Sequence, residues 1–186
     1  MNDAIAYARQ NPGKLSYGTS GVGNQPHLWA ELLRARLNMK MENVAYKGVA
    51  DTLRDVLAGH VPIIIDVVLP TGNHVAAGRL KGICVASPER SSICPTVPTV
   101  GELGMKDMES AVFYGLVAPA SVPRPIIDRL NGLVQEAIKD PAVVQKYSDL
   151  GFFMTGSTPE AYLEKLKFET VRWTKVVKDN GIKVES

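Results

Sequence analysis

Over the first half of the chain, the pattern of apolar and polar positions switches repeatedly between two periods. Short apolar runs, typical of strands, are separated by stretches in which apolar residues recur every three or four positions, as in amphipathic helices. The expected strands are residues 14–17, 43–46, 61–65 and 80–86, and the expected helices are 3–10, one from Pro26, one between Gly48 and Gly59, and 70–77. The run 61–65 is typical of a strand buried in a parallel sheet. This alternation predicts an α/β fold with a mixed sheet of the parallel type.

The pattern changes after Pro88. A loop that contains Pro95 and Pro98 carries a short expected helix at 100–103, and a longer extended run follows it at 111–117. Beyond it we expect helices at 125–139, 141–150 and 159–178, each with a proline in its first turn, where proline is tolerated. We therefore predict two domains, an α/β ligand-binding lobe at residues 1–117 and a C-terminal helical segment at residues 118–186.

A glycine-rich loop at residues 17–27 joins the first expected strand to the next helix. The first N–H groups of a helix lack intrahelical partners, and the helix dipole there favours negative charge. Glycine also lets the backbone approach a bound group closely. We therefore predict a site for a carboxylate or phosphate, and its candidate residues are Thr19, Ser20, Gly21, Val22, Gly23, Asn24 and His27. The alternative is a tight turn in which the glycines only permit a positive φ.

His27 and Asp66 are the candidate side chains beside this loop. His27 falls in the first helical turn, where a charged imidazolium is disfavoured, so we expect it to be neutral and hydrogen-bonded. Asp66 ends a buried expected strand, on the edge where open α/β sheets bind ligands. Its carboxylate can accept a hydrogen bond from a ligand ammonium or hydroxyl, or order a bridging water. The alternative role for Asp66 is capping of the following turn.

Other classes of site have weaker support in the sequence. Gly21 and Gly23 lack the third glycine of a dinucleotide fingerprint, because Pro26 stands in its place, although Lys47 keeps an NADP- or phosphate-binding enzyme as an alternative. The serines lie in no G-x-S-x-G elbow, so a nucleophilic catalytic site has little support. The three histidines lack metal-ligand spacing, so no metal site is expected.

Composition narrows the partners and the compartment. The 186 residues are 45% apolar and 22% charged, with a net charge of +2; without a dense basic run, nucleic acid is not expected as a partner. No apolar run is long enough to span a bilayer, and residues 1–20 show no signal peptide. The chain is then expected to be cytoplasmic, or a mature or trimmed piece of a longer protein. Cys84 and Cys94 match no zinc or redox motif, and a disulfide between them needs an oxidising compartment.

Several segments together resemble the receptors of tripartite tricarboxylate transporters, the Bug family of solute-binding proteins. The matching segments are residues 11–18, 20–23, 27–28, 46–48, 65–66, 77–80, 95–100, 114–116 and 118–120, with Trp173 and residues 181–182. The resemblance implies a periplasmic receptor of type II periplasmic-binding-protein fold. Its two α/β lobes would close on a small carboxylate or amino acid and pass it to membrane transporter subunits, without catalytic residues and without a cofactor. Carried over, residues 19–23 and His27 would form the second lobe's share of the site, beside Asp66.

The resemblance also implies that this chain lacks most of the first lobe, since Met1 falls near the entry to the second. The apolar faces of the helices after Pro125 would then need another partner, and we expect a homodimer or a segment-exchanged dimer. Because the chain would carry only half of the binding site, a third interpretation stays open, namely a stand-alone interaction domain without a ligand. The expectation that carries the receptor interpretation is that backbone N–H groups at the start of the first long helix are unpaired.

Overall fold

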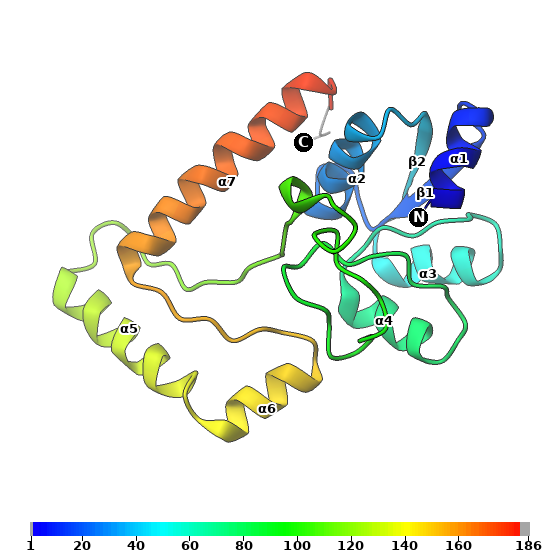
Figure 1. The fold of residues 1–186 in the computed structure, drawn as a ribbon. Helices are drawn as coiled ribbons and strands as arrows, with labels where there is room; N and C mark the ends of the chain where they lie inside the picture. Colours follow the sequence, from blue (N-terminus) through cyan, green and yellow to red (C-terminus); the bar gives the residue numbers. More distant parts are fainter. Residues whose placement is uncertain (1, 183–186) are drawn as a thin grey trace. The chain divides into compact units, whose positions relative to one another are not determined.

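The computed structural model describes residues 2–182, with side chains from Ile5 onward. The described chain divides into two units, one that runs to Val112 and resumes at Lys175, and one formed by Phe113–Thr174. The first unit contains α1 (Asn2–Gln10), β1 (Leu15–Thr19), α2 (Gln25–Arg36), β2 (Met41–Ala45), α3 (Val49–Leu57), α4 (Val68–Ala76) and the short 3₁₀ helix η1 (Lys106–Met108). The second contains α5 (Arg124–Ala137), α6 (Pro141–Asp149) and most of α7 (Pro159–Asp179) (Figure 1).

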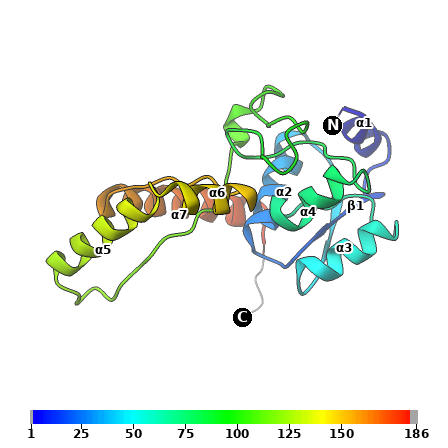
Figure 2. The same cartoon turned by 90° about the horizontal axis from the view of Figure 1, so that it is seen from below.

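The first unit is built on a parallel pair of strands. β1 pairs with β2 in the register Leu15 to Met41 through Thr19 to Ala45. A third extended segment reaches β1 from the other side, where Gly18 donates to the carbonyl of Ile63 at 2.8 Å and Ile65 donates to the carbonyl of Gly18 at 3.0 Å. Because β1 is central, the right-handed crossovers to its two neighbours fall on opposite faces. Figure 2 shows α2 and α3 on opposite sides of the β1–β2 pair. The expected α/β class is confirmed.

Two expected strands are much shorter than predicted. Residues 61–65 form only the bridge between Ile64 and Gly18, and residues 80–86 form only the bridge between Val85 and Thr99. Proline explains the second, because it cannot donate a hydrogen bond to a strand ladder and Pro98 lies in the partner segment of that bridge. Pro62 does not explain the first, since the backbone groups of Ile63 and Ile65 are the ones that bond to β1. Nor are residues 63–65 fully buried, as a central strand would be.

The structure also differs from the prediction in two further segments and at the ends of two elements. The extended run at 111–117 contains no strand, and its exposed residues have no strand partner among the described residues. The short helix expected at 100–103 is a series of turns, followed by η1. β1 continues through Thr19, so the glycine loop begins at Ser20 rather than at Tyr17. α4 begins at Val68, two residues earlier than expected. Just before this start, the carboxylate of Asp66 accepts a hydrogen bond from the N–H of Val67.

The core of the first unit fixes β1 against α2. Tyr17 is fully buried, and its hydroxyl donates to Oε1 of buried Glu31 at 2.6 Å. Glu31 also pairs with Arg34 at 2.8 Å. On the same helix, the indole N–H of Trp29 donates to the carbonyl of buried Met108 at 2.9 Å. Buried hydrogen bonds therefore join α2, the helix that follows the glycine loop, to β1 and to η1. They fix the position of the helix at whose start the loop ends.

The second unit lacks a core of its own. None of the described residues from Phe113 to Thr174 is fully buried. Its internal contacts are edge-on aromatic pairs, such as Phe113 with Tyr162 and Tyr114 with Phe152, and Gly115 leaves the space that Tyr162 occupies. Large apolar side chains remain exposed along α5, namely Ile126, Leu130 and Leu133.

Candidate functional site

The glycine loop connects the carboxyl end of β1 to the first turn of α2. Asn24 is the N-cap of α2, and its side-chain oxygen accepts a hydrogen bond from the N–H of His27 at 3.0 Å. The amide nitrogen of Asn24 donates back to the hydroxyl of Ser20 at 3.1 Å. Gly23 donates its N–H to Nδ1 of His27 at 3.0 Å. Three short bonds therefore give the loop one defined conformation, and the residues that make them are predicted site residues.

The remaining N–H groups of the loop are the ones available to a ligand. The backbone N–H groups of Ser20, Gly21 and Val22 donate no hydrogen bond to any described residue. These three residues lie outside the regular elements, and Gly23 and the N-cap Asn24 separate them from α2, a helix of 12 residues. Consecutive unpaired N–H groups in a loop that leads into a helix are suited to an anion.

Two glycines permit this backbone path. Gly21 has a φ of 153° and Gly23 a φ of 78°, a region that other residues rarely adopt. A side chain at Gly21 would meet no close obstacle, because the nearest atoms to an added Cβ lie 3.5 Å away at Asn24 and 3.9 Å away at Tyr46. Glycine is therefore needed at position 21 for its backbone conformation and not for space.

Some of the predicted site residues already make hydrogen bonds within the protein, and others leave groups available to a ligand. Thr19 is fully buried, and its hydroxyl donates to the side-chain oxygen of Asn43 at 2.9 Å. His27 is buried and accepts from the loop, while Val22 is exposed. Thr19, Asn24 and His27 thus support the loop, and Ser20 to Val22 present its open N–H groups.

The eighth predicted residue, Asp66, lies at the same edge of the sheet. It follows Ile65, whose N–H donates to the carbonyl of Gly18 one residue before Thr19. Oδ1 of Asp66 accepts from the N–H of Val67 at 2.8 Å, but Val67 itself is the N-cap of α4, and no side chain caps that helix. Oδ2 is buried and has no hydrogen-bond partner among the described residues.

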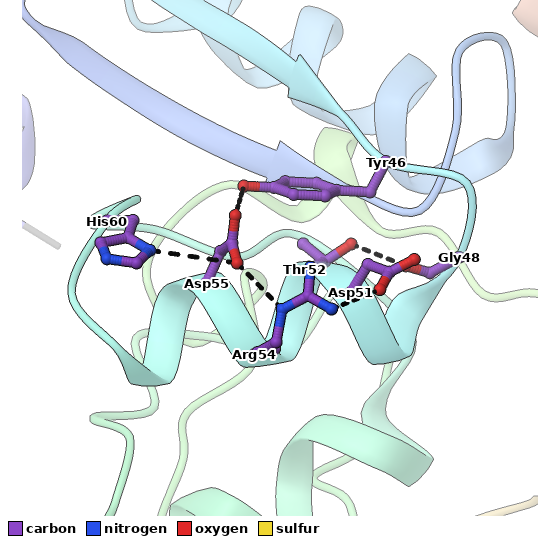
Figure 3. Close-up of polar contacts among 7 residues, drawn as sticks. All are labelled: Tyr46, Gly48, Asp51, Thr52, Arg54, Asp55 and His60. Carbon is purple, nitrogen blue, oxygen red and sulfur yellow. Dashed lines mark hydrogen bonds and ion pairs between the residues drawn. The ribbon is translucent and has the colours of Figure 1, made fainter.

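Tyr46, the residue after β2, supports the loop and was not among the predicted site residues. Its N–H donates to the carbonyl of Thr19 at 2.9 Å, and its ring lies against Gly18, where an added Cβ would come within 3.3 Å. Its hydroxyl donates to Asp55 on α3 at 3.0 Å (Figure 3). This bond, with the neighbouring guanidinium of Arg54, lowers the pKa of Asp55.

Asn43 was missed as well, although its signal is present in the sequence. In the parallel register Thr19 is opposite Ala45, and side chains two positions apart on a strand share a face. A polar side chain at position 43 therefore falls beside Thr19 once the strands are paired. Asp55 carries no comparable signal, since an acidic residue on an amphipathic helix is ordinary.

The protonation of His27 is expected to make stability depend on pH. Burial lowers the pKa of His27 below its usual 6.5, and a proton on Nδ1 would remove the acceptor for the N–H of Gly23. The unfolded chain then takes up this proton first, so the contribution of His27 is fully present above about pH 6.5 and is lost as the pH falls toward the lower folded-state value.

Urea unfolding of the wild type and of His27→Gln between pH 5 and 8 measures this effect. The free energy of unfolding of the wild type should fall more steeply below about pH 6.5 than that of the variant, which lacks the titrating group. Parallel curves for the two proteins would contradict the assignment.

The two remaining expectations from the sequence concern a disulfide between the cysteines and a helix that could span a membrane. Cys84 and Cys94 are both free thiols, and burial raises the pKa of the Cys84 thiol to about 11. Within residues 2–182, no helix combines the length and the apolar composition needed to cross a membrane.

Comparison with known proteins gives a consistent match. The family model described as the tripartite tricarboxylate transporter family receptor matches residues 1–182. A curated relative from Pseudomonas sp. (strain P51), the UPF0065 protein in the tcbD-tcbE intergenic region, is 37% identical over 178 residues, which are 95% of this chain and 53% of the relative. The chain thus spans about half the length of this relative.

Solved structures agree with the family match. The Rhodopseudomonas palustris protein Rpa4515, solved with adipate, superposes with a TM-score of 0.83 at 31% identity, over 98% of this chain and 61% of that one. The protein MatC (Rpa3494) from Rhodopseudomonas palustris, solved with bound malate, superposes with a TM-score of 0.73 at 26% identity, over 95% of this chain and 61% of that one.

Proposed function

Because this chain belongs to the tripartite tricarboxylate transporter receptor family, we propose that it provides one half of a binding site for a small dicarboxylate. The half-site consists of the loop from Ser20 to Asn24, the start of α2 and Asp66. In this proposal the protein binds and releases its solute without changing it. The family is one of receptors and not of enzymes.

One observation carries the proposal, namely the unpaired backbone N–H groups of Ser20, Gly21 and Val22. A carboxylate that accepts two or three of them gains charge-assisted hydrogen bonds. It also lies at the positive end of the dipole of α2. The rest of the loop need not rearrange to receive it, because Asn24 and His27 already hold its conformation.

The class of solute is supported by the solved relatives. Rpa4515 was solved with adipate and MatC with malate, and both compounds are linear dicarboxylates. One carboxylate would be bound by the loop described here, and the other end of the molecule would extend away from it. An amino acid with an acidic side chain fits the same description.

The family also supports a proposal about the compartment and the partners of the protein. We propose that the protein acts in the periplasm and delivers its solute to the membrane subunits of a tripartite transporter. Residues 118–186 are proposed to pack on a first lobe like that of the longer relatives, and the exposed apolar side chains of α5 support this. The homodimer or segment-exchanged dimer expected for the chain by itself remains a prediction.

Titration of the ¹⁵N-labelled chain followed by NMR tests the proposal. L-Malate, succinate and adipate, each raised to tens of millimolar, are expected to shift the amide resonances of Ser20, Gly21 and Val22 in a saturable way. Weak, millimolar affinity is expected, because a half-site leaves the solute in contact with water.

NADPH and inorganic phosphate are the matched comparisons. Saturable shifts in the loop with NADPH or phosphate, and none with the dicarboxylates, would favour the enzyme alternative. A chain that responds to none of the five compounds would contradict the dicarboxylate site and favour the interaction domain without a ligand.

A further inference from the structure

One acidic oxygen beside the proposed site has no hydrogen-bond donor. Oδ2 of Asp66 is buried, and no described residue donates to it. Oδ1 of the same carboxylate is occupied by the N–H of Val67 at 2.8 Å, so the side chain cannot rotate to pair Oδ2 without losing that bond. A buried carboxylate oxygen without a donor is energetically unfavourable, and such an atom requires an explanation.

Two structural features place Asp66 with the loop. The segment Ile63–Ile65 is hydrogen-bonded to both the N–H and the carbonyl of Gly18, so Asp66 follows the segment adjacent to β1. Parallel neighbours present their carboxyl ends at one edge, which is the edge where Ser20, Gly21 and Val22 lie. Asp66 is also partly exposed as a residue, so the carboxylate is not sealed within the core.

The charges at this edge are opposite in character. The N–H groups of the loop and the dipole of α2 attract an anion, whereas a carboxylate at Asp66 repels one and attracts a donor. A solute that satisfies both carries its own hydrogen-bond donor near a carboxylate. Hydroxyl and ammonium groups are such donors, as in a 2-hydroxy or 2-amino dicarboxylate.

We propose that Asp66 makes this site selective for dicarboxylates that carry a hydroxyl or ammonium donor next to a carboxylate. This inference rests on the proposed function and extends it, since the loop alone does not distinguish malate from succinate. With succinate the donor to Oδ2 has to be a water molecule. The expected preference is about 10- to 100-fold, the range for a hydrogen bond to a charged group.

Parallel titrations of the wild-type chain with L-malate, L-aspartate and succinate test the selectivity without any mutation. The affinity is measured from the amide shifts of the loop. Malate or aspartate should bind at least about tenfold more tightly than succinate. If succinate binds as tightly as both, the role of Asp66 is wrong, although the dicarboxylate site stands. If none of the three binds, the proposed function fails and the inference fails with it.

Asp66→Asn then assigns the preference to this residue. The substitution keeps the shape and one acceptor oxygen but removes the charge, so malate should lose its advantage while the affinity for succinate is retained or rises. Asp51→Asn is the matched control, since Asp51 is half-exposed and paired with Arg54, and it should leave the ratio unchanged. A preference that survives in folded Asp66→Asn would overturn the inference.

Discussion

Substituting Gly21 with alanine is expected to weaken dicarboxylate binding by about 10- to 100-fold, which corresponds to roughly 1–3 kcal/mol of backbone strain. Gly21 has a φ of 153°, and an alanine would move the backbone toward a negative φ. That movement would reorient the N–H groups of Gly21 and Val22. An added Cβ meets no atom closer than 3.5 Å, so the loss is expected in the loop conformation and not in the core.

The amide shifts of the loop on titration with L-malate measure this effect, and thermal unfolding monitors the fold. Gly48→Ala is the matched control, because Gly48 also precedes a helix but has an extended φ of 174° and no atom within 4 Å of an added Cβ. The control should bind like the wild type. Unchanged affinity in Gly21→Ala would show that the conformation at Gly21 is not needed for binding.

Substituting Trp29 with alanine is expected to lower the free energy of unfolding by about 3–5 kcal/mol, a large share of the stability of a domain of this size. Trp29 is 8% exposed, and its indole N–H donates to the carbonyl of Met108 at 2.9 Å. The substitution removes the largest side chain on the buried face of α2 and leaves that carbonyl without its donor. The helix that supports the glycine loop loses its buried hydrogen bond to η1 and keeps only the exposed ion pair of Arg36 with Asp107 there.

Urea unfolding followed by circular dichroism measures the change, since the variant loses part of the tryptophan fluorescence. Trp29→Phe separates the two contributions, because it keeps most of the apolar volume and loses the donor, at an expected loss of about 1–3 kcal/mol. Trp173→Ala is the control at a partly buried tryptophan whose ring contacts Arg172. Equal losses for Trp29→Ala and Trp173→Ala would contradict the role assigned to burial.

The sequence predicted the helices better than the strands. A helix satisfies its backbone hydrogen bonds within one segment, so local signals such as the stop at residues 11–13 and the proline at the start of α6 are sufficient. A strand needs a partner elsewhere in the chain. The runs at 61–65 and 80–86 have the composition of strands, but each finds a neighbour over a single bridge.

The site shows the same division between local and distant information. The sequence alone identified the α/β class, the loop at the start of α2 and the neutral, hydrogen-bonded His27, because these follow from residue type and from near neighbours. Only the tertiary structure revealed that Thr19 bonds to Asn43, that Tyr46 links the loop to Asp55, and that one oxygen of Asp66 is left unpaired. The physical reason is that a hydrogen bond across segments depends on strand register and burial, and both are set by the packing of the chain as a whole.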